Sequence, residues 1–88
     1  MKIDKVAMIG AGSWGTALAL VLARKNIRVA LWDRDADHIA NLVRDRENKR
    51  HQPDHPFPES LHVTGDLAAA VTGANCVVMV VPSHGYRE

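Results

Sequence analysis

Residues 8–20 read MIGAGSWGTALAL, in which Gly10, Gly12 and Gly15 lie between an apolar run and a segment with helical spacing. Glycine inside a helix costs up to about 1 kcal/mol relative to alanine, so glycines at the start of a helix need a reason. Their spacing is G-x-G-x-x-G, directly after an expected strand and at the start of an expected helix, which is the context that dinucleotide binding requires. A strand-to-helix turn with a purely structural role is the alternative.

Each glycine has its own expected role. Gly10 permits a tight turn out of the strand, Gly12 lets a diphosphate approach the bare backbone, and Gly15 lets the helix pack tightly against the neighbouring strand. We expect the N–H groups of Ser13 and Trp14 to point at the phosphates, where the positive end of the helix dipole adds attraction. Two interpretations of the Trp14 ring stay open, packing into the core or contact with the cofactor.

Strands and helices alternate along the rest of the chain. We expect strands at 5–9, 27–32, 61–64 and 76–81, and helices at 13–25, 36–48 and 66–71. Asp35 is the expected cap of the second helix and Asn26 the left-handed end of the first. The prolines in KRHQPDHPFPES, at 49–60, predict a surface loop. This order predicts an α/β fold, the first half of a doubly wound (Rossmann) parallel sheet, βαβαβαβ and incomplete, with the first strand inside the sheet.

Apolar spacing predicts which side chains are buried. The first helix is expected to bury Trp14, Ala17, Leu18, Val21 and Leu22, and the second Ile39, Leu42 and Val43. The run CVVMVV at 76–81 is expected to form a strand covered on both faces, with Cys76 as a buried reduced thiol. The same strand is expected at or near an open sheet edge, where it can pair with another copy.

Two charged residues at the end of the second strand bear on the choice of cofactor. Asp33 lies about 20 residues beyond the glycines, where a carboxylate can accept hydrogen bonds from the ribose hydroxyls of NAD. Arg34 follows it, and its guanidinium can hold the 2′-phosphate of NADP. Because the carboxylate repels the phosphate that the arginine attracts, we expect use of both cofactors. Ordinary turn residues before a capped helix are the alternative.

Composition excludes several classes of protein. At 88 residues the chain is one domain at most, and its net charge of +1 gives no reason to expect nucleic acid or acidic lipid as a partner. No apolar stretch is long enough to span a bilayer and the N-terminus lacks a secretory pattern, so a cytoplasmic location is expected. His51 and His55 are four residues apart, but in a proline-bearing loop they do not share a helix face, and we expect no metal site.

Four stretches together resemble the N-terminal part of bacterial NAD(P)-dependent glycerol-3-phosphate dehydrogenase. They are GAGSWGTALALVLA at 10–23, LWDRD at 31–35, ENKRHQPDHPFPESLHVTGDL at 47–67 and VVMVVPSH at 77–84. The resemblance implies a two-domain cytosolic oxidoreductase that interconverts dihydroxyacetone phosphate and sn-glycerol 3-phosphate for phospholipid synthesis, with NAD or NADP as cofactor. Residues 1–88 would then be the N-terminal portion of its dinucleotide-binding domain, and a homodimer is a candidate assembly.

The resemblance also implies roles for single residues. Ser13 and Trp14 would touch the cofactor phosphates, Arg34 would receive the adenosine side of NADPH, and His51 would border the same pocket by a looser match. The family more often has a small neutral residue where Asp33 stands, which argues against a pure NADPH preference.

The family's proton-donating lysine and substrate-phosphate ligands come after residue 88. We therefore expect no catalytic residue within the chain and no dehydrogenase activity from these 88 residues alone. A different class of protein stays open from the residues themselves, because a non-catalytic NAD-sensing Rossmann module that controls a channel or repressor has the same glycines and acidic residue.

Overall fold

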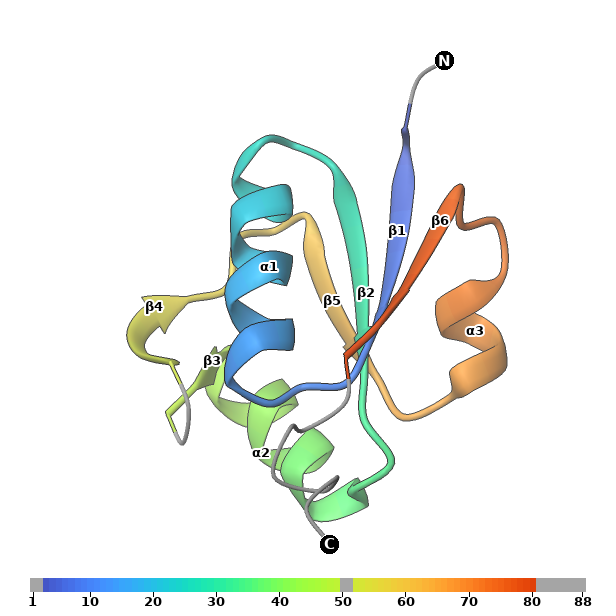
Figure 1. Cartoon of the computed structure of the whole chain (residues 1–88). Coiled ribbons are helices and arrows are strands. Elements are labelled where there is room, and N and C mark those ends of the chain that lie inside the picture. Colours follow the sequence, from blue (N-terminus) through green and yellow to red (C-terminus); the bar gives the residue numbers. More distant parts are fainter. Residues whose placement is uncertain (1–2, 50–51, 81–88) are drawn as a thin grey trace, which may run out of the picture.

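The computed structural model describes residues 3–49 and 52–80, which form a parallel sheet with helices on both faces and a small hairpin beside it (Figure 1). Four strands make the main sheet in the order β5-β2-β1-β6: β1 (Lys5–Ile9), β2 (Arg28–Trp32), β5 (Leu61–Thr64) and β6 (Cys76–Met79). β1 lies inside the sheet, with Ala7 opposite both Ala30 and Val77. The predicted fold class, the incomplete first half of a doubly wound sheet, is confirmed.

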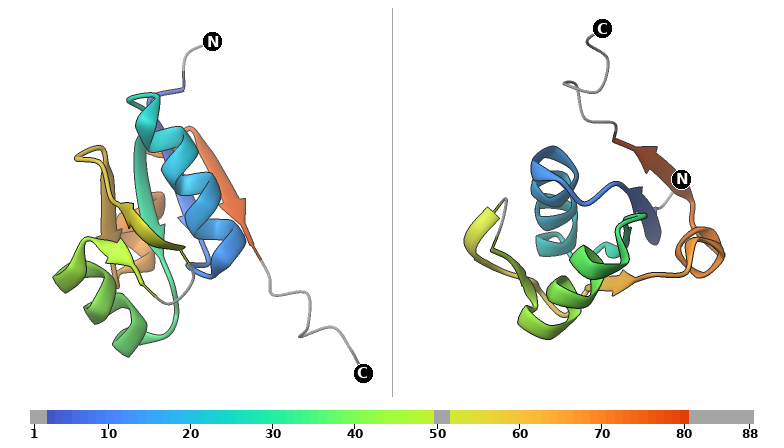
Figure 2. Two further views of the ribbon diagram at one scale, coloured as in Figure 1. Left: turned by 90° about the vertical axis from the view of Figure 1, so that its left-hand side faces the viewer. Right: turned by 90° about the horizontal axis from the view of Figure 1, so that it is seen from below.

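Three helices connect the strands: α1 (Ser13–Arg24), α2 (Ala36–Asp45) and α3 (Leu67–Val71). Figure 2 shows α1 and α3 on opposite sides of the sheet. Side chains alternate between the two faces of a strand, so every second strand residue belongs to the core that includes α1. The main core joins strand residues Val6, Met8, Val29, Leu31 and Leu61 to Ala19, Leu20 and Ala23 of α1. No helix in the described ranges is long and apolar enough to cross a bilayer.

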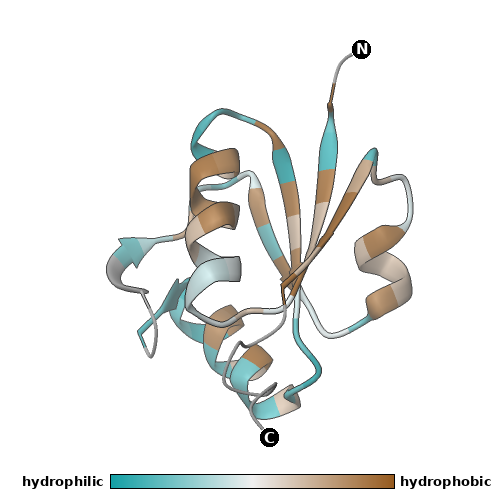
Figure 3. Ribbon diagram, in the orientation of Figure 1, coloured by the Kyte–Doolittle hydropathy of each residue, from teal (hydrophilic) through white to brown (hydrophobic). Residues whose placement is uncertain are grey.

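The buried face of α1 is not the predicted one. Its buried residues are Gly15, Thr16, Ala19, Leu20 and Ala23, whereas Trp14, Leu18 and Val21 are exposed by 75%, 41% and 49%. Apolar residues cover much of the surface of α1 (Figure 3), so hydropathy alone did not single out the buried face. Size decides instead, because small residues repeated every four positions let the helix lie close to the sheet. The predicted burial of Trp14, Leu18 and Val21 is wrong.

α2 begins where it was predicted to begin and ends three residues early. The carboxylate of Asp35 caps its start, and the predicted burial of Ile39 and Leu42 is confirmed, but Val43 is 52% exposed. The helix ends because Arg46 adopts a left-handed conformation with φ of 52°. Asn26, with φ of 66°, turns the chain after α1 in the same way, as predicted.

A two-stranded hairpin occupies part of the stretch where a loop was predicted. β3 (Glu47–Asn48) pairs in antiparallel fashion with β4 (Gln52–Pro56), and the chain bulges between Glu47 and Asn48. Prolines exclude a central strand, but a two-stranded hairpin has two edges whose amides need no strand partner. The hairpin is hydrophilic (Figure 3) and is a sheet separate from the main one, but Asn48 of β3 is fully buried, so this residue does not lie at the surface.

β6 is less covered than predicted. Cys76 and Val77 are exposed and Met79 is 72% exposed, so a strand covered on both faces with a buried Cys76 is wrong for the described residues. The reason is its place in the sheet, since α1 lies over β1, β2 and β5. Among the described strands β6 is an outer one, which confirms the predicted open edge. The predicted end of this strand at Val81 lies outside the described residues.

Candidate functional site

The glycine turn, residues 10–15, joins the carboxyl end of β1 to the first turn of α1. Gly10 has φ of +120°, and a Cβ atom there would lie 2.5 Å from the carbonyl oxygen of Val80. A Cβ atom on Gly15 would overlap the carbonyl oxygen of Gly10. The tight turn at Gly10 and the close packing of Gly15 are therefore confirmed, although Gly15 packs on the turn itself rather than on a neighbouring strand.

Gly12 differs from the other two glycines because it faces open space. A Cβ atom built on Gly12 would meet nothing within 4 Å, and its φ of −81° is accessible to any residue. Neither folding nor packing within the described residues therefore requires glycine at position 12. The space that a Cβ would occupy is available to a ligand that approaches the backbone closely.

The amino end of α1 has no negative charge of its own. Gly12 is its N-cap and supplies no side-chain hydrogen bond, and the first turn holds no acidic residue. The positive end of the helix dipole is therefore directed at the space beside Gly12, where an anion is stabilised. Ser13 and Trp14 are exposed at the start of the helix, next to that space. With Trp14 exposed by 75%, its packing into the core is wrong, and its contact with a cofactor stays a prediction.

The end of β2 lies against the glycine turn, so the two predicted parts of the site come together. The N–H of Gly10 donates to the carbonyl of Trp32 at 2.7 Å, and the N–H of Ala11 donates to Oδ2 of Asp33 at 3.3 Å. The other carboxylate oxygen of Asp33 accepts a bond from the Asp35 N–H at 3.4 Å. Asp33 thus supports the backbone of the turn, a role that its sequence position did not reveal.

Arg34 is exposed at the same edge, directly after Asp33. No hydrogen bond or ion pair within the described residues holds its guanidinium, which leaves it able to reach a ligand phosphate. His51 lies outside the described residues. No three His, Cys, Asp or Glu side chains gather as metal ligands would in residues 3–49 and 52–80.

Three buried polar side chains behind the turn were missed by sequence reasoning. Thr16, His38 and Asn48 all place a polar atom within hydrogen-bond distance of the carbonyl oxygen of Ala11. They come from α1, α2 and β3, so no spacing along the chain connects them. No local signal was available, because a polar residue such as Asn48 at the end of the predicted helix is ordinarily exposed to solvent.

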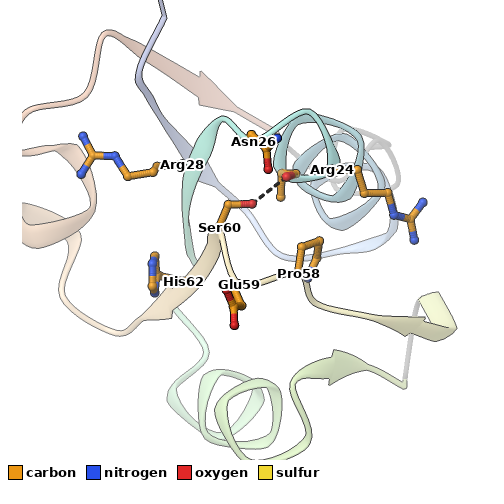
Figure 4. A pocket seen from close by; sticks show the side chains of 8 residues that line it. Arg24, Asn26, Arg28, Pro58, Glu59, Ser60 and His62 are labelled. Carbon is orange, nitrogen blue, oxygen red and sulfur yellow. Dashed lines mark hydrogen bonds between the residues drawn. The ribbon is translucent and has the colours of Figure 1, made fainter.

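A pocket lies at the opposite end of the sheet (Figure 4), beside the carboxyl end of α1 and the starts of β2 and β5. Arg24, Arg28, Glu59 and His62 are among its lining residues, and the Ser60 hydroxyl donates to the carbonyl of Ala23 at 2.6 Å. Ligands of doubly wound sheets bind at the carboxyl ends of the strands. This pocket is at the amino ends and is not the predicted site.

The residues at the glycine turn fit a dinucleotide. The open space at Gly12 admits a diphosphate to the backbone, the amino end of α1 attracts its charge, and the edge that carries Asp33 and Arg34 adjoins it.

Comparison with known proteins agrees with this geometry. Residues 5–88 match the family model described as NAD-dependent glycerol-3-phosphate dehydrogenase N-terminus. The chain is 51% identical over 83 residues to glycerol-3-phosphate dehydrogenase [NAD(P)+] from Escherichia coli O1:K1, covering 94% of the chain and 24% of that relative.

Solved structures give the same result. Glycerol-3-phosphate dehydrogenase from Coxiella burnetii superposes with a TM-score of 0.88 at 47% identity, over 92% of this chain and 25% of that one. The Plasmodium falciparum enzyme has a TM-score of 0.73 at 25% identity, over 89% and 24% of the two chains. The chain spans about a quarter of the length of these relatives. A glycine turn of this geometry, within a match that includes nearly every residue, shows that the chain belongs to the family of the NAD-dependent glycerol-3-phosphate dehydrogenase N-terminus.

Proposed function

We propose that this chain provides the NAD(P)-binding turn of an oxidoreductase that interconverts dihydroxyacetone phosphate and sn-glycerol 3-phosphate for glycerophospholipid synthesis. The observation that carries the proposal is the amino end of α1, which opens on Gly12 without a capping side chain or an acidic residue. The names of the matched relatives, glycerol-3-phosphate dehydrogenase [NAD(P)+], support the substrate pair and both cofactors.

In this proposal each residue of the site holds one part of the cofactor. The backbone at Gly12, Ser13 and Trp14 binds the diphosphate, with Gly10 and Gly15 shaping the turn. Asp33 lies at the end of β2, where it can accept hydrogen bonds from the adenosine ribose. When bound, the nicotinamide cofactor supplies the hydride that the reaction exchanges.

Two more residues complete the proposed adenosine side. Arg34 pairs with the 2′-phosphate of NADP, and His51 borders the pocket. The carboxylate of Asp33 already accepts the Ala11 N–H, so one side chain orients the turn and faces the ribose. A carboxylate held at this place favours NAD and repels the 2′-phosphate of NADP, and the guanidinium of Arg34 offsets that repulsion, so we propose that both cofactors bind.

A titration of the purified chain with NADH and NADPH tests the proposed binding. Trp14 lies in the first turn of α1 and Trp32 ends β2, so both indoles report on ligand at this edge by fluorescence. We expect saturable quenching by both cofactors. A chain that stays folded, with no response to either cofactor at millimolar concentration, contradicts the proposal.

The catalytic part of the proposal needs the longer protein, since the relatives are about four times the length of this chain. We expect a protein that carries this chain and the remaining segments to oxidise NADH or NADPH with dihydroxyacetone phosphate, and residues 1–88 alone to show no turnover. Binding of NAD without turnover in that longer protein would favour a non-catalytic NAD sensor instead. We also propose a cytoplasmic location and a homodimer, which fractionation and light scattering test.

A further inference from the structure

We propose that Thr16, His38 and Asn48 are positioning residues, which hold the Ala11 carbonyl so that the Gly12 amide is aimed at the diphosphate. The inference deepens the proposed function and rests on it. None of the three residues lies at the open side of the turn, and none is expected to touch the cofactor.

The three side chains form a compact group, called here the Ala11 cluster. Their exposed fractions are 0% for Thr16, 6% for His38 and 0% for Asn48, and Ala11 itself is fully buried. Toward the Ala11 carbonyl oxygen the distances are 3.3 Å from Thr16 Oγ1, 2.9 Å from His38 Nε2 and 3.0 Å from Asn48 Nδ2. Asn48 Nδ2 also lies 2.7 Å from Thr16 Oγ1.

The chemistry of these groups fixes the direction of each hydrogen bond. A carbonyl oxygen only accepts, so His38 must carry a proton on Nε2. The Asn48 amide has two N–H groups, one for the Ala11 carbonyl and one for the Thr16 hydroxyl. The Thr16 hydroxyl keeps its own proton for the Ala11 carbonyl. All three side chains therefore donate to one oxygen.

Three donors exceed what hydrogen-bond satisfaction requires. A carbonyl oxygen has two lone pairs, so two donors would suffice to bury the Ala11 carbonyl without penalty. The donors come from three different elements, α1, α2 and β3, and they approach one peptide group of the glycine turn. Such an arrangement restricts the orientation of that peptide more than a single bond within the turn would.

The orientation of the Ala11 carbonyl determines the orientation of the Gly12 N–H. Both belong to the same planar trans peptide unit, in which the C=O and N–H bonds point in opposite directions. With the oxygen held inside the protein, the Gly12 N–H is directed outward, to the side where a Cβ would meet nothing within 4 Å. The preceding peptide is held as well, because the Ala11 N–H donates to Asp33. The turn is thus preorganised for an anion, which lowers the ordering cost of binding.

Two substitutions test the cluster by calorimetric titration with ADP-ribose, NADH and NADPH. Asn48→Asp replaces two donors by a carboxylate oxygen that repels the Ala11 carbonyl, and Thr16→Val keeps the shape of the side chain while removing its hydroxyl. We expect affinity for all three ligands to fall roughly tenfold in Asn48→Asp and about threefold in Thr16→Val, with the ratio of NADH to NADPH affinity unchanged. Thr16→Ser, which keeps the hydroxyl, should restore binding.

Ser60→Ala is the matched control. Its hydroxyl also donates to a backbone carbonyl of α1, that of Ala23, but at the opposite end of the helix. This variant should lose stability without loss of ligand affinity. A purely structural role for the cluster would make Thr16→Val behave in the same way.

A spectroscopic readout separates aiming of the amide from general loosening. In protein labelled with ¹⁵N-glycine, ADP-ribose should shift the Gly12 amide resonance strongly in the wild type and less in Thr16→Val at saturating ligand. An unchanged Gly12 shift together with unchanged affinity in Thr16→Val overturns the inference, even if Asn48→Asp does not fold. A folded wild type that binds none of the three ligands overturns the proposed function and this inference together.

Discussion

The amino end of α1 differs from the amino ends of α2 and α3 in what closes it. Asp35 accepts bonds from the N–H groups of Asp37 and His38 at 3.1 and 3.2 Å, and Asp66 accepts from those of Ala68 and Ala69 at 3.0 and 3.3 Å. Gly12 offers no side chain to α1. Two helices thus bind amides of their first turn with an aspartate of their own, and α1 has no such side chain.

This difference in capping is what the proposed binding of a diphosphate at α1 would require. An aspartate cap is worth about 1 kcal/mol relative to alanine, and all three helices follow a strand or turn where such a cap would fit. The helix without one follows β1, which pairs with both β2 and β6, and it starts at the carboxyl ends of the strands, where doubly wound sheets bind ligands. The same carboxylate that stabilises α2 would exclude a diphosphate at α1.

The largest expected effect comes from Gly15→Ala, which tests whether the uncapped amino end of α1 requires the close contact between Gly15 and the backbone of Gly10. The added methyl group would overlap the Gly10 carbonyl group, which is backbone and leaves little room to relax. We expect unfolding stability to fall by about 4 kcal/mol, with loss of NADH binding. Urea denaturation measures the first effect and fluorescence titration the second. A stable Gly15→Ala chain that binds NADH normally would contradict the packing role.

Gly12→Asp converts the amino end of α1 into a copy of the other two. The backbone at Gly12 is already extended, with φ of −81°, so an aspartate can cap the helix there. We expect roughly 100-fold weaker binding of NADH and NADPH from charge repulsion and occlusion, together with equal or slightly higher stability. Gly12→Ala is the matched variant, which blocks the approach without adding charge and should weaken binding less. Unaltered affinity in Gly12→Asp would place the diphosphate elsewhere.

Arg34→Ala tests whether Arg34, which lies after β2 beside the amino end of α1, selects between NADH and NADPH. Removing the guanidinium should weaken NADPH by about 1.5–3 kcal/mol, the range for hydrogen bonds to charged groups, and leave NADH unaffected. Paired titrations with the two cofactors check this result. Equal losses for NADH and NADPH would reject the contact between Arg34 and the 2′-phosphate.

Asp35→Ala opens the amino end of α2 and should not create a second site. Loss of the two hydrogen bonds to Asp37 and His38 is expected to cost about 1 kcal/mol of unfolding stability. NADH affinity should fall much less than in Gly12→Asp, because alanine keeps the backbone bond to Asp33 and only the lost cap on the His38 N–H bears on the Ala11 cluster. Asp66→Ala is the corresponding control at α3. A marked loss of NADH affinity in Asp35→Ala would show that α2 capping also orients the site.

The smallest effect is expected away from all three amino ends, in the last turn of α2. A hydrogen bond from Arg44 Nε, at 3.0 Å, and the charge of Arg44 hold the pKa of Asp45 below its usual value. A depressed carboxyl pKa in the folded state stabilises the protein above the unfolded pKa, near 4, and this stabilisation is lost as pH falls through the folded value.

Asp45→Asn should therefore lower the urea midpoint slightly at neutral pH and not at all in stronger acid. High salt should shrink the difference, since the pair lies at the surface. A difference that grows as the pH falls would contradict the sign of this pKa shift.

The residues that build the glycine turn were predictable because their requirements are local. Gly10 needs a positive φ, which is a property of its own backbone, and Gly15 needs close approach to Gly10, five positions away. The predicted cap Asp35 also acts on amides two and three residues ahead. A short sequence window contains all of this information. Only the contact between Gly10 and Val80 is distant in the chain.

The buried face of α1 and the Ala11 cluster were not predictable in this way. α1 is apolar around most of its surface, and only the sheet reveals that it requires the small residues Ala19 and Ala23 rather than Trp14. Thr16, His38 and Asn48 meet at Ala11 from positions as far apart as 37 residues. Nothing local to any of them indicates that they share one carbonyl oxygen.

The sequence by itself determined the alternation of strands and helices, the left-handed turn at Asn26 after α1, the capped start of α2 and the uncapped start of α1. Each of these features depends on backbone conformation and short-range hydrogen bonds. Tertiary structure alone decided which side of α1 is buried and which way the Ala11 peptide points. Those outcomes depend on volume and donor groups contributed by distant segments, and such contacts exist only after the chain has closed on itself.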